Sequence, residues 1–313
     1  MKWWLSVLYL MTSCHRPIID FPSYFPQENR MAFDTISMEQ IKLGERLFFD
    51  PRLSLNNKIS CATCHKPELA FTDGEKISKG FEGNFSLHNS STLFNIGFHP
   101  TLMFDNRSHS LELQPMLPIQ DSHEMRETIF HIEEKLKNDR QYQQMSQAAF
   151  GDRLSIYNYN RALSAYMKSL ISANSTFDLF YKSKDSSVLS PKEKRGMALF
   201  FGKGNCSSCH CFPLFTNFQH YNLGLEDSLH GRLGLYRSTH LADDRGRFKT
   251  PTLRNIEITS PYFHDGRIQS LDSTLIIHIS NQTKDYIPPK LSPDEQKDIV
   301  VFLKTLTDKR FKK

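Results

Sequence analysis

The sequence has no long run of lysine and arginine, and no apolar stretch long enough to cross a bilayer. Its formal charge of +5 is spread over 313 residues, which argues against a nucleic-acid-binding protein and leaves room for weak attraction to an acidic protein partner. The strict alternation of apolar and polar residues that is typical of strands is scarce. These absences favour a globular, mainly helical chain with room for two domains.

The first 14 residues have the layout of a secretory signal. One lysine precedes the apolar stretch 3–11, and small polar residues and Cys14 follow it. Met-Thr-Ser-Cys, which ends at Cys14, resembles a bacterial lipoprotein cleavage box and predicts lipidation of this cysteine; an ordinary signal peptide with an incidental cysteine is the alternative. We therefore expect an exported, periplasmic protein anchored to a bacterial membrane through its lipid, with residues 15–33 as a tether.

Four of the other five cysteines form two copies of the pattern C-x-x-C-H. The copies consist of Cys61, Cys64 and His65, and of Cys206, Cys209 and His210. This pattern attaches c-type haem, because the two thiols add to the haem vinyl groups and the adjacent histidine binds the iron. Disulfides and a zinc site are the alternatives; Cys211 makes the second copy look metal-like, but the first copy has no matching cysteine. We predict two covalent c-type haems and assign no role to Cys211.

Segments that follow the two patterns repeat at a constant distance. Residues 92–96 (TLFNI) match 252–256 (TLRNI), and 105–107 (DNR) match 265–267 (DGR). Both pairs are 160 residues apart, since 252 − 92 and 265 − 105 each give 160. A single register for several pairs indicates an internal duplication.

Helical periodicity is present over residues 129–150, 156–171 and 294–306. Ser190, followed by proline and then by glutamate at the third helical position, predicts the start of another helix. We expect an all-α fold of two cytochrome c-type haem domains with long loops. The expected boundaries are 34–181 for the N-terminal domain, 182–188 for the linker and 189–313 for the C-terminal domain.

With these residues in view, the chain resembles the bacterial diheme cytochrome c peroxidases, a family that includes the MauG-type enzymes. The resemblance covers about residues 36–306 and is carried by LFFDPRLS before ISCATCH, by HNSSTLFN, by FDNR with LELQ, and by FKTPTLRNIEITSPYFHDGR. It implies an N-terminal haem that reacts with hydrogen peroxide and a C-terminal haem that receives electrons from a small c-type cytochrome or copper protein. Members of the family are often homodimers.

The resemblance also implies the residues of the peroxide pocket. The family has a Gln followed ten positions later by a Glu, and here 124 − 114 is 10, which selects Gln114 and Glu124. Glu124 would move the proton, helped by a pKa that burial raises; a solvated loop carboxylate is the alternative, and His123 is the second candidate for the base. Many members have a distal histidine near the position of Phe81, but residues 66–87 contain none. This predicts a haem that reacts without reductive activation, as in the MauG-type branch.

Two further positions follow from the resemblance. The family usually has a Trp between the haems, ten residues before that Gln, and here the position is Phe104. Phenylalanine fills the space but is harder to oxidise, which favours electron tunnelling over radical hopping. The family's calcium ion between the domains would be held by Asn89, Thr259 and Pro261.

The second iron needs a ligand opposite His210. Most peroxidases of the family use Met and the MauG type uses Tyr, but no Met follows Met197. Aligning residues 266–272 on the family's G-R-x-x-x-L-E places the ligand seven positions after Leu271, at His278. A packed structural histidine is the alternative, and the competing ligands are His220, His230, His240 and His264. Ligation by two histidines lowers the haem potential, which puts the identity of the electron donor in doubt.

Two functions stay open at this point. The first is a peroxidase that reduces hydrogen peroxide to water with electrons from a small redox protein. The second is a MauG-like oxidase that uses peroxide to oxidise a protein or small-molecule substrate. Glu124 and the lack of a distal histidine disfavour a third reading, a non-enzymatic electron carrier.

Overall fold

The computed structural model describes residues 18–312 except for 29 and 226–232. The predicted signal peptide and Cys14 therefore lie outside the described residues, as does His230. The described chain is mainly helical, and its sheet is one short antiparallel pair, β1 (His220–Tyr221) and β2 (Phe248–Lys249). None of the helices described is long and apolar enough to cross a membrane. The predicted helical fold class is confirmed.

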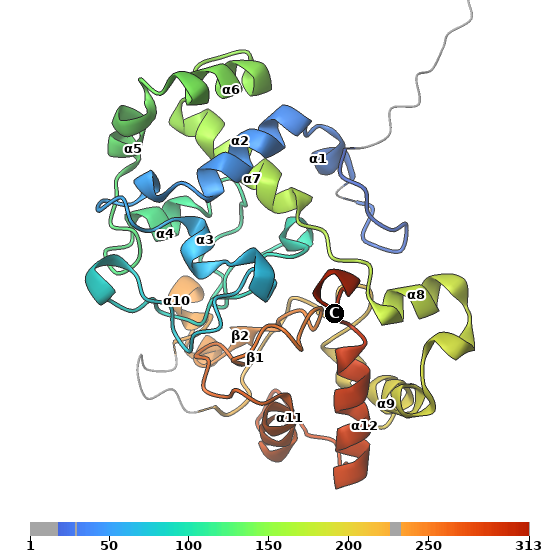
Figure 1. Ribbon diagram of the computed structural model, residues 1–313. Coiled ribbons are helices and arrows are strands. Elements are labelled where there is room, and N and C mark those ends of the chain that lie inside the picture. Colours follow the sequence, from blue (N-terminus) through green and yellow to red (C-terminus); the bar gives the residue numbers. More distant parts are fainter. Residues whose placement is uncertain (1–17, 29, 226–232, 313) are drawn as a thin grey trace, which may run out of the picture.

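The two halves of the chain form two helical lobes with long loops between them (Figure 1). The sheet and α10 of the second half lie where the lobes meet. In chain order the helices are α1 (Arg30–Asp34), α2 (Met38–Phe48), α3 (Cys61–Cys64), α4 (Met116–Gln120), α5 (Ile129–Leu136), α6 (Arg140–Phe150), α7 (Ile156–Ser169), α8 (Thr176–Ser183), α9 (Pro191–Phe201), α10 (Tyr236–Thr239), α11 (Leu271–Ser280) and α12 (Pro293–Lys304).

Capping residues determine where several helices begin. Ser190 accepts a hydrogen bond from the Glu193 backbone and Glu193 bonds back, so α9 starts at the predicted position. The predicted helical stretch 129–150 is divided into α5 and α6, because Asp139 caps a new helix with two hydrogen bonds to its side chain.

Each lobe is built on one close pair of helices, α2 with α7 and α9 with α12. A Cβ atom added to Gly44 of α2 would lie 1.9 Å from the Ala162 carbonyl oxygen of α7. A Cβ added to Gly196 of α9 would lie 1.9 Å from the Asp298 carbonyl oxygen of α12. Glycine at these two positions therefore lets the helix backbones touch, and the second lobe repeats the contact of the first.

One buried segment between α7 and α8 joins the lobes. Asn95 of the first lobe exchanges two hydrogen bonds of 3.0 Å with the Ser172 backbone. Asn255 of the second lobe donates to the Ser172 hydroxyl at 3.0 Å. The two asparagines occupy matching places in the repeated TLFN and TLRN segments, so the lobes meet on a single serine.

The expected tether is packed where the structure describes it. Ile19, Phe21 and Phe25 are buried and form a third core with residues of both lobes, such as Phe98 and Leu214. The segment packs because it is rich in aromatic residues, and each aromatic ring that packs removes a large apolar area from water.

Tyr24 of the same segment donates a hydrogen bond of 2.9 Å to Asp178. Asp178 in turn pairs with the buried Arg254 at 2.9 Å. The segment is therefore held to α8, and through Asp178 to Arg254 of the second lobe, by a part-buried, charge-assisted hydrogen bond as well as by apolar packing.

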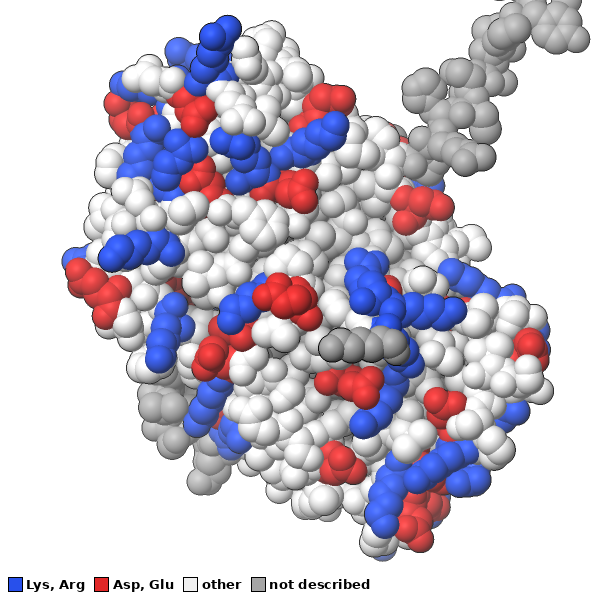
Figure 2. Space-filling model, in the orientation of Figure 1, with Lys and Arg blue, Asp and Glu red and all other residues white. Residues whose placement is uncertain are grey.

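Charged side chains of both signs are interspersed over the face drawn in Figure 2, with uncharged areas between them. This face carries no large field of one sign that would select a strongly charged partner.

Candidate active site

The first C-x-x-C-H pattern opens into a cavity of the N-terminal lobe. Short helix α3 carries Cys61 and Cys64, both of which are free thiols, and His65 follows at its end. With its opening to solvent included, the cavity encloses about 1240 Å³ of empty space, and its wall is mainly apolar. Two thiols and one imidazole beside such a cavity fit a covalently attached haem.

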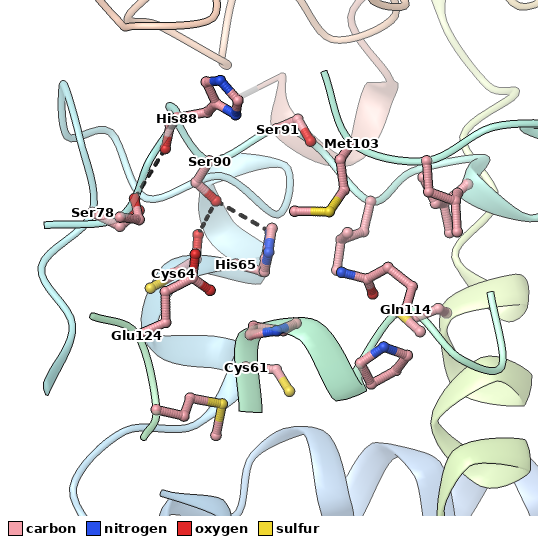
Figure 3. Close-up of a pocket in the computed structure, with 18 of the residues that line it drawn as sticks. Cys61, Cys64, His65, Ser78, His88, Ser90, Ser91, Met103, Gln114 and Glu124 are labelled. Carbon is pink, nitrogen blue, oxygen red and sulfur yellow. Dashed lines mark hydrogen bonds between the residues drawn. The ribbon is translucent and has the colours of Figure 1, made fainter. Parts of the chain in front are cut away.

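The imidazole of His65 is oriented by its neighbours. Its Nδ1 lies 2.9 Å from the Phe71 carbonyl oxygen and 3.2 Å from the Ser90 hydroxyl (Figure 3). A hydrogen bond at Nδ1 leaves Nε2 as the metal-binding nitrogen. Burial lowers the pKa of His65, which keeps the ring neutral as ligation requires.

Glu124 and Gln114 line the same cavity and lie on opposite sides of His65 in Figure 3. The pKa of Glu124 is raised to about 7, chiefly by burial and next by the negative charge of Asp121, while the positive charge of Arg107 opposes the shift. A carboxyl group with this pKa exists in both protonation states near neutral pH, so it can accept and release a proton. The side chain of His123 is 63% exposed and bonds to Asp121, so this histidine faces solvent.

Residues 80 and 81 hold the backbone of Glu124 in place. The Phe81 N–H donates a hydrogen bond of 2.8 Å to the Glu124 carbonyl oxygen. A Cβ atom on Gly80 would lie 2.7 Å from the Glu124 Cα, so only glycine fits there. The side chain of Phe81, which the sequence analysis matched to the family's distal histidine position, is buried.

The second pattern opens into a cavity of the C-terminal lobe, lined by Cys206, Cys209 and His210. The Nδ1 atom of His210 lies 3.2 Å from the Phe215 carbonyl oxygen, which repeats the arrangement of the first lobe. Burial lowers the pKa of His210 to about 4. His278 of α11 lines this cavity too, with its ring centroid 6.3 Å from that of His210.

The competing histidines are placed differently. His264 lines the second cavity, but its ring is stacked on Phe248 at 3.6 Å. His220 and His240 are not among the described residues that line it. Burial, together with the nearby His210, lowers the pKa of His278 to about 4, so its imidazole is neutral near pH 7.

Phe104 lines both cavities and thus lies between them, at the place predicted for the inter-haem residue. The His88 ring lies 6.0 Å from that of Phe104, 5.9 Å from Phe248 and 6.1 Å from His264. The sequence analysis missed this aromatic cluster, although His88 begins the HNSSTLFN segment and His264 lies in YFHDGR.

The predicted calcium ligands stay a prediction. The Asn89 side-chain amide donates 2.9 Å to the Glu75 carbonyl oxygen, and its backbone N–H donates 2.8 Å to that of His264. Asn89 thus joins loops of both lobes. Residues 18–312, with their two gaps, contain no group of three or more His, Cys, Asp or Glu side chains suited to a metal ion.

Comparison with known proteins agrees with this geometry. The model of the di-haem cytochrome c peroxidase family matches residues 38–186. The chain is 33% identical to the methylamine utilization protein MauG of Methylorubrum extorquens over 279 residues, which cover 87% of this chain and 79% of that protein. It is also 33% identical to the cytochrome c551 peroxidase of Pseudomonas aeruginosa over 293 residues, 91% of this chain and 83% of that protein.

A solved structure of a MauG-like protein associated with microbial copper homeostasis superposes with a TM-score of 0.82 at 29% identity, covering 93% of this chain and 96% of that chain. Two cavities with attachment cysteines, and relatives of this identity over most of their length, lead to one assignment. The chain belongs to the di-haem cytochrome c peroxidase family, which includes the MauG proteins.

Proposed function

We propose that the protein is a diheme peroxidase that reduces hydrogen peroxide to water with electrons from a small c-type cytochrome or copper protein. The balance is H₂O₂ + 2e⁻ + 2H⁺ → 2H₂O. The observation that carries the proposal is Glu124, a half-buried carboxyl group with a pKa near 7 in the cavity that also holds Cys61, Cys64 and His65. An electron carrier has no use for such a group.

When bound, a haem in the first cavity would supply the iron at which peroxide is reduced. His65 would hold that iron, with its ring direction set by the Phe71 carbonyl. Glu124 takes the proton from one peroxide oxygen and returns it to the other, so that the departing oxygen leaves as water. Gln114 supplies an amide that can orient peroxide toward Glu124.

In the second cavity we propose that His278, together with His210, would hold the haem iron. The 6.3 Å separation of their ring centroids, with both rings at the cavity wall, supports this assignment. Such a haem would supply the site at which electrons are accepted, and Phe104, which lines both cavities, would lie between the two haems.

Several finer features belong to the same proposal. Equal close contacts at Gly44 and Gly196 support an internal duplication of two haem domains, about 34–181 and 189–313. We propose export, lipidation of Cys14 and a calcium ion bound by Asn89, Thr259 and Pro261 from the sequence resemblance alone.

The alternative is a MauG-like oxidase that uses peroxide to oxidise a protein or a small molecule. The observation that favours it is the absence of histidine from residues 66–87, together with the buried Phe81 at the distal position.

Steady-state turnover distinguishes the two. Peroxide consumption by the purified diheme protein is measured with a reduced small c-type cytochrome and with a reduced copper protein as donors. Fast consumption that depends on the donor supports the peroxidase. Reaction with peroxide but negligible turnover with both donors would reject it in favour of the oxidase.

A further inference from the structure

Lys249 of β2 is a buried cation at the wall of the second cavity. Its side chain is 7% exposed, and it is the single Lys, Arg, Asp or Glu among the described residues that line this cavity. Its backbone N–H donates 3.0 Å to the Phe104 carbonyl oxygen, which places the lysine at the border with the first cavity. Burying a single charged group in an otherwise apolar wall is costly, so such a charge is expected to have a specific partner.

Among the described residues, the Lys249 ammonium bonds to a backbone carbonyl and not to a carboxylate. The ammonium has three N–H groups, and its Nζ donates 2.8 Å to the Thr101 carbonyl oxygen. Asp105 is the nearby carboxylate whose charge acts on it, but that carboxylate pairs with Arg107 at 2.8 Å. A buried ammonium without a counter-charge is costly, and burial lowers the pKa of Lys249 to about 8.

Two neighbouring imidazoles also have unsatisfied nitrogens. His220 pairs with Lys249 across the sheet, and its buried Nε2 has no hydrogen-bond partner. The buried Nδ1 of His99 has none either. Burial and the positive charge of Lys249 lower the pKa of both rings. His99 and His220 thus place no negative charge beside the Lys249 ammonium, and neither is among the described residues that line the second cavity.

We infer that Lys249 is the counter-ion of a propionate carboxylate of the haem in the second cavity, an inference that rests on the proposed function. Haem carries two propionates on one edge, and this cavity offers them no other lysine or arginine among its described residues. The first cavity differs, because its lining cation Arg107 is already neutralised by Asp105.

The charge of Lys249 would affect the reduction potential of the second haem. A cation that lacks a protein counter-ion offsets the propionate charge, and it thereby destabilises ferric iron relative to ferrous iron in the second haem. Lys249 would raise the potential that ligation by two histidines lowers, and so keep the second haem able to accept electrons.

The test uses the diheme holoprotein and the variants Lys249→Met and Lys249→Arg. The matched control is Lys284→Met, which removes the same charge from a surface lysine that is 59% exposed. Haem content is measured first, then the midpoint potential of each haem by spectroelectrochemistry, and the propionate bending mode of the low-spin haem by resonance Raman.

We expect two haems per chain in all variants, a negative shift of the low-spin potential in Lys249→Met that exceeds the shift in Lys284→Met, and near-native values in Lys249→Arg. Equal shifts in the two Met variants, with an unmoved propionate mode, would overturn the inference and leave the proposed function intact. A single haem in the wild-type chain would instead overturn the proposed function. If Lys249→Met does not accumulate, Lys249→Gln, which keeps an N–H donor, gives the same comparison.

Discussion

Replacing Glu124 by Gln keeps the size of this half-buried side chain but removes its ability to exchange a proton. General acid–base groups contribute about 10²- to 10⁴-fold to a rate, so the second-order rate with peroxide should fall by about this factor. In the wild type the rate should rise with pH through about 7, because the ionised carboxylate is the base. In Glu124→Gln that inflection should vanish.

The same shift has a measurable effect on stability. The pKa of Glu124 is about 7 against an ordinary value of 4.5, and at about 1.36 kcal/mol per pH unit the difference is about 3 kcal/mol. The folded protein binds the proton more tightly than the unfolded chain, so this stabilisation is complete below pH 4.5 and is lost as the pH rises through about 7. The free energy of unfolding of Glu124→Gln, measured relative to that of the wild type, should therefore increase by about 3 kcal/mol between pH 4 and pH 8.

The assays are stopped-flow mixing with peroxide from pH 5 to pH 9, and denaturant unfolding at both ends of the stability range. Glu82→Gln is the matched control, since that carboxylate is 68% exposed and lies in the neighbouring loop. A Glu124→Gln protein that reacts as fast as the wild type, with the same pH profile, would refute the role of Glu124. If the difference in unfolding free energy between the wild type and Glu124→Gln does not change with pH, the folded protein does not hold Glu124 as a neutral acid.

Other substitutions test further parts of the structure. His278→Ala should convert the low-spin haem to a different spin state, and an unchanged low-spin EPR signal would remove it as a ligand. Asp178→Ala leaves Arg254 buried without its partner and should lower the free energy of unfolding by about 3–5 kcal/mol in denaturant titrations, whereas Tyr24→Phe, which removes one hydrogen bond to Asp178, should cost about 1.5–3 kcal/mol. Gly196→Ala should cost about 1–3 kcal/mol because α9 must move away from α12; a native unfolding midpoint would contradict the close contact.

Features that depend on short, local spacing could be predicted from the sequence. The Cys-x-x-Cys-His patterns and the Ser190 cap are of this kind, and the structure brings the residues of each together. Gln114, Glu124 and Phe104 were selected by the resemblance to the family; the structure places them at the cavity walls, and their roles stay predictions.

Features that depend on distant partners could not be predicted. Residues 15–33 were expected to form a tether because the segment has little periodicity, but Phe21 and Phe25 find aromatic partners such as Phe98 more than 70 residues away. The cluster of His88 with Phe248 and His264 joins remote loops, so no spacing rule signals it.

The meeting of Asn95 and Asn255 on Ser172 is one of several contacts that fix the relative placement of the two lobes, beside the third core around Phe98 and Leu214. Electron tunnelling falls steeply with distance, so a slight change there would alter the transfer rate between haems without touching either cavity. If the two lobes were produced separately, either Asn95 or Asn255 would lose its hydrogen-bond partner at Ser172. Differences in the rate of electron transfer between related diheme proteins can therefore arise at the contact of Ser172 with Asn95 and Asn255, away from both cavities.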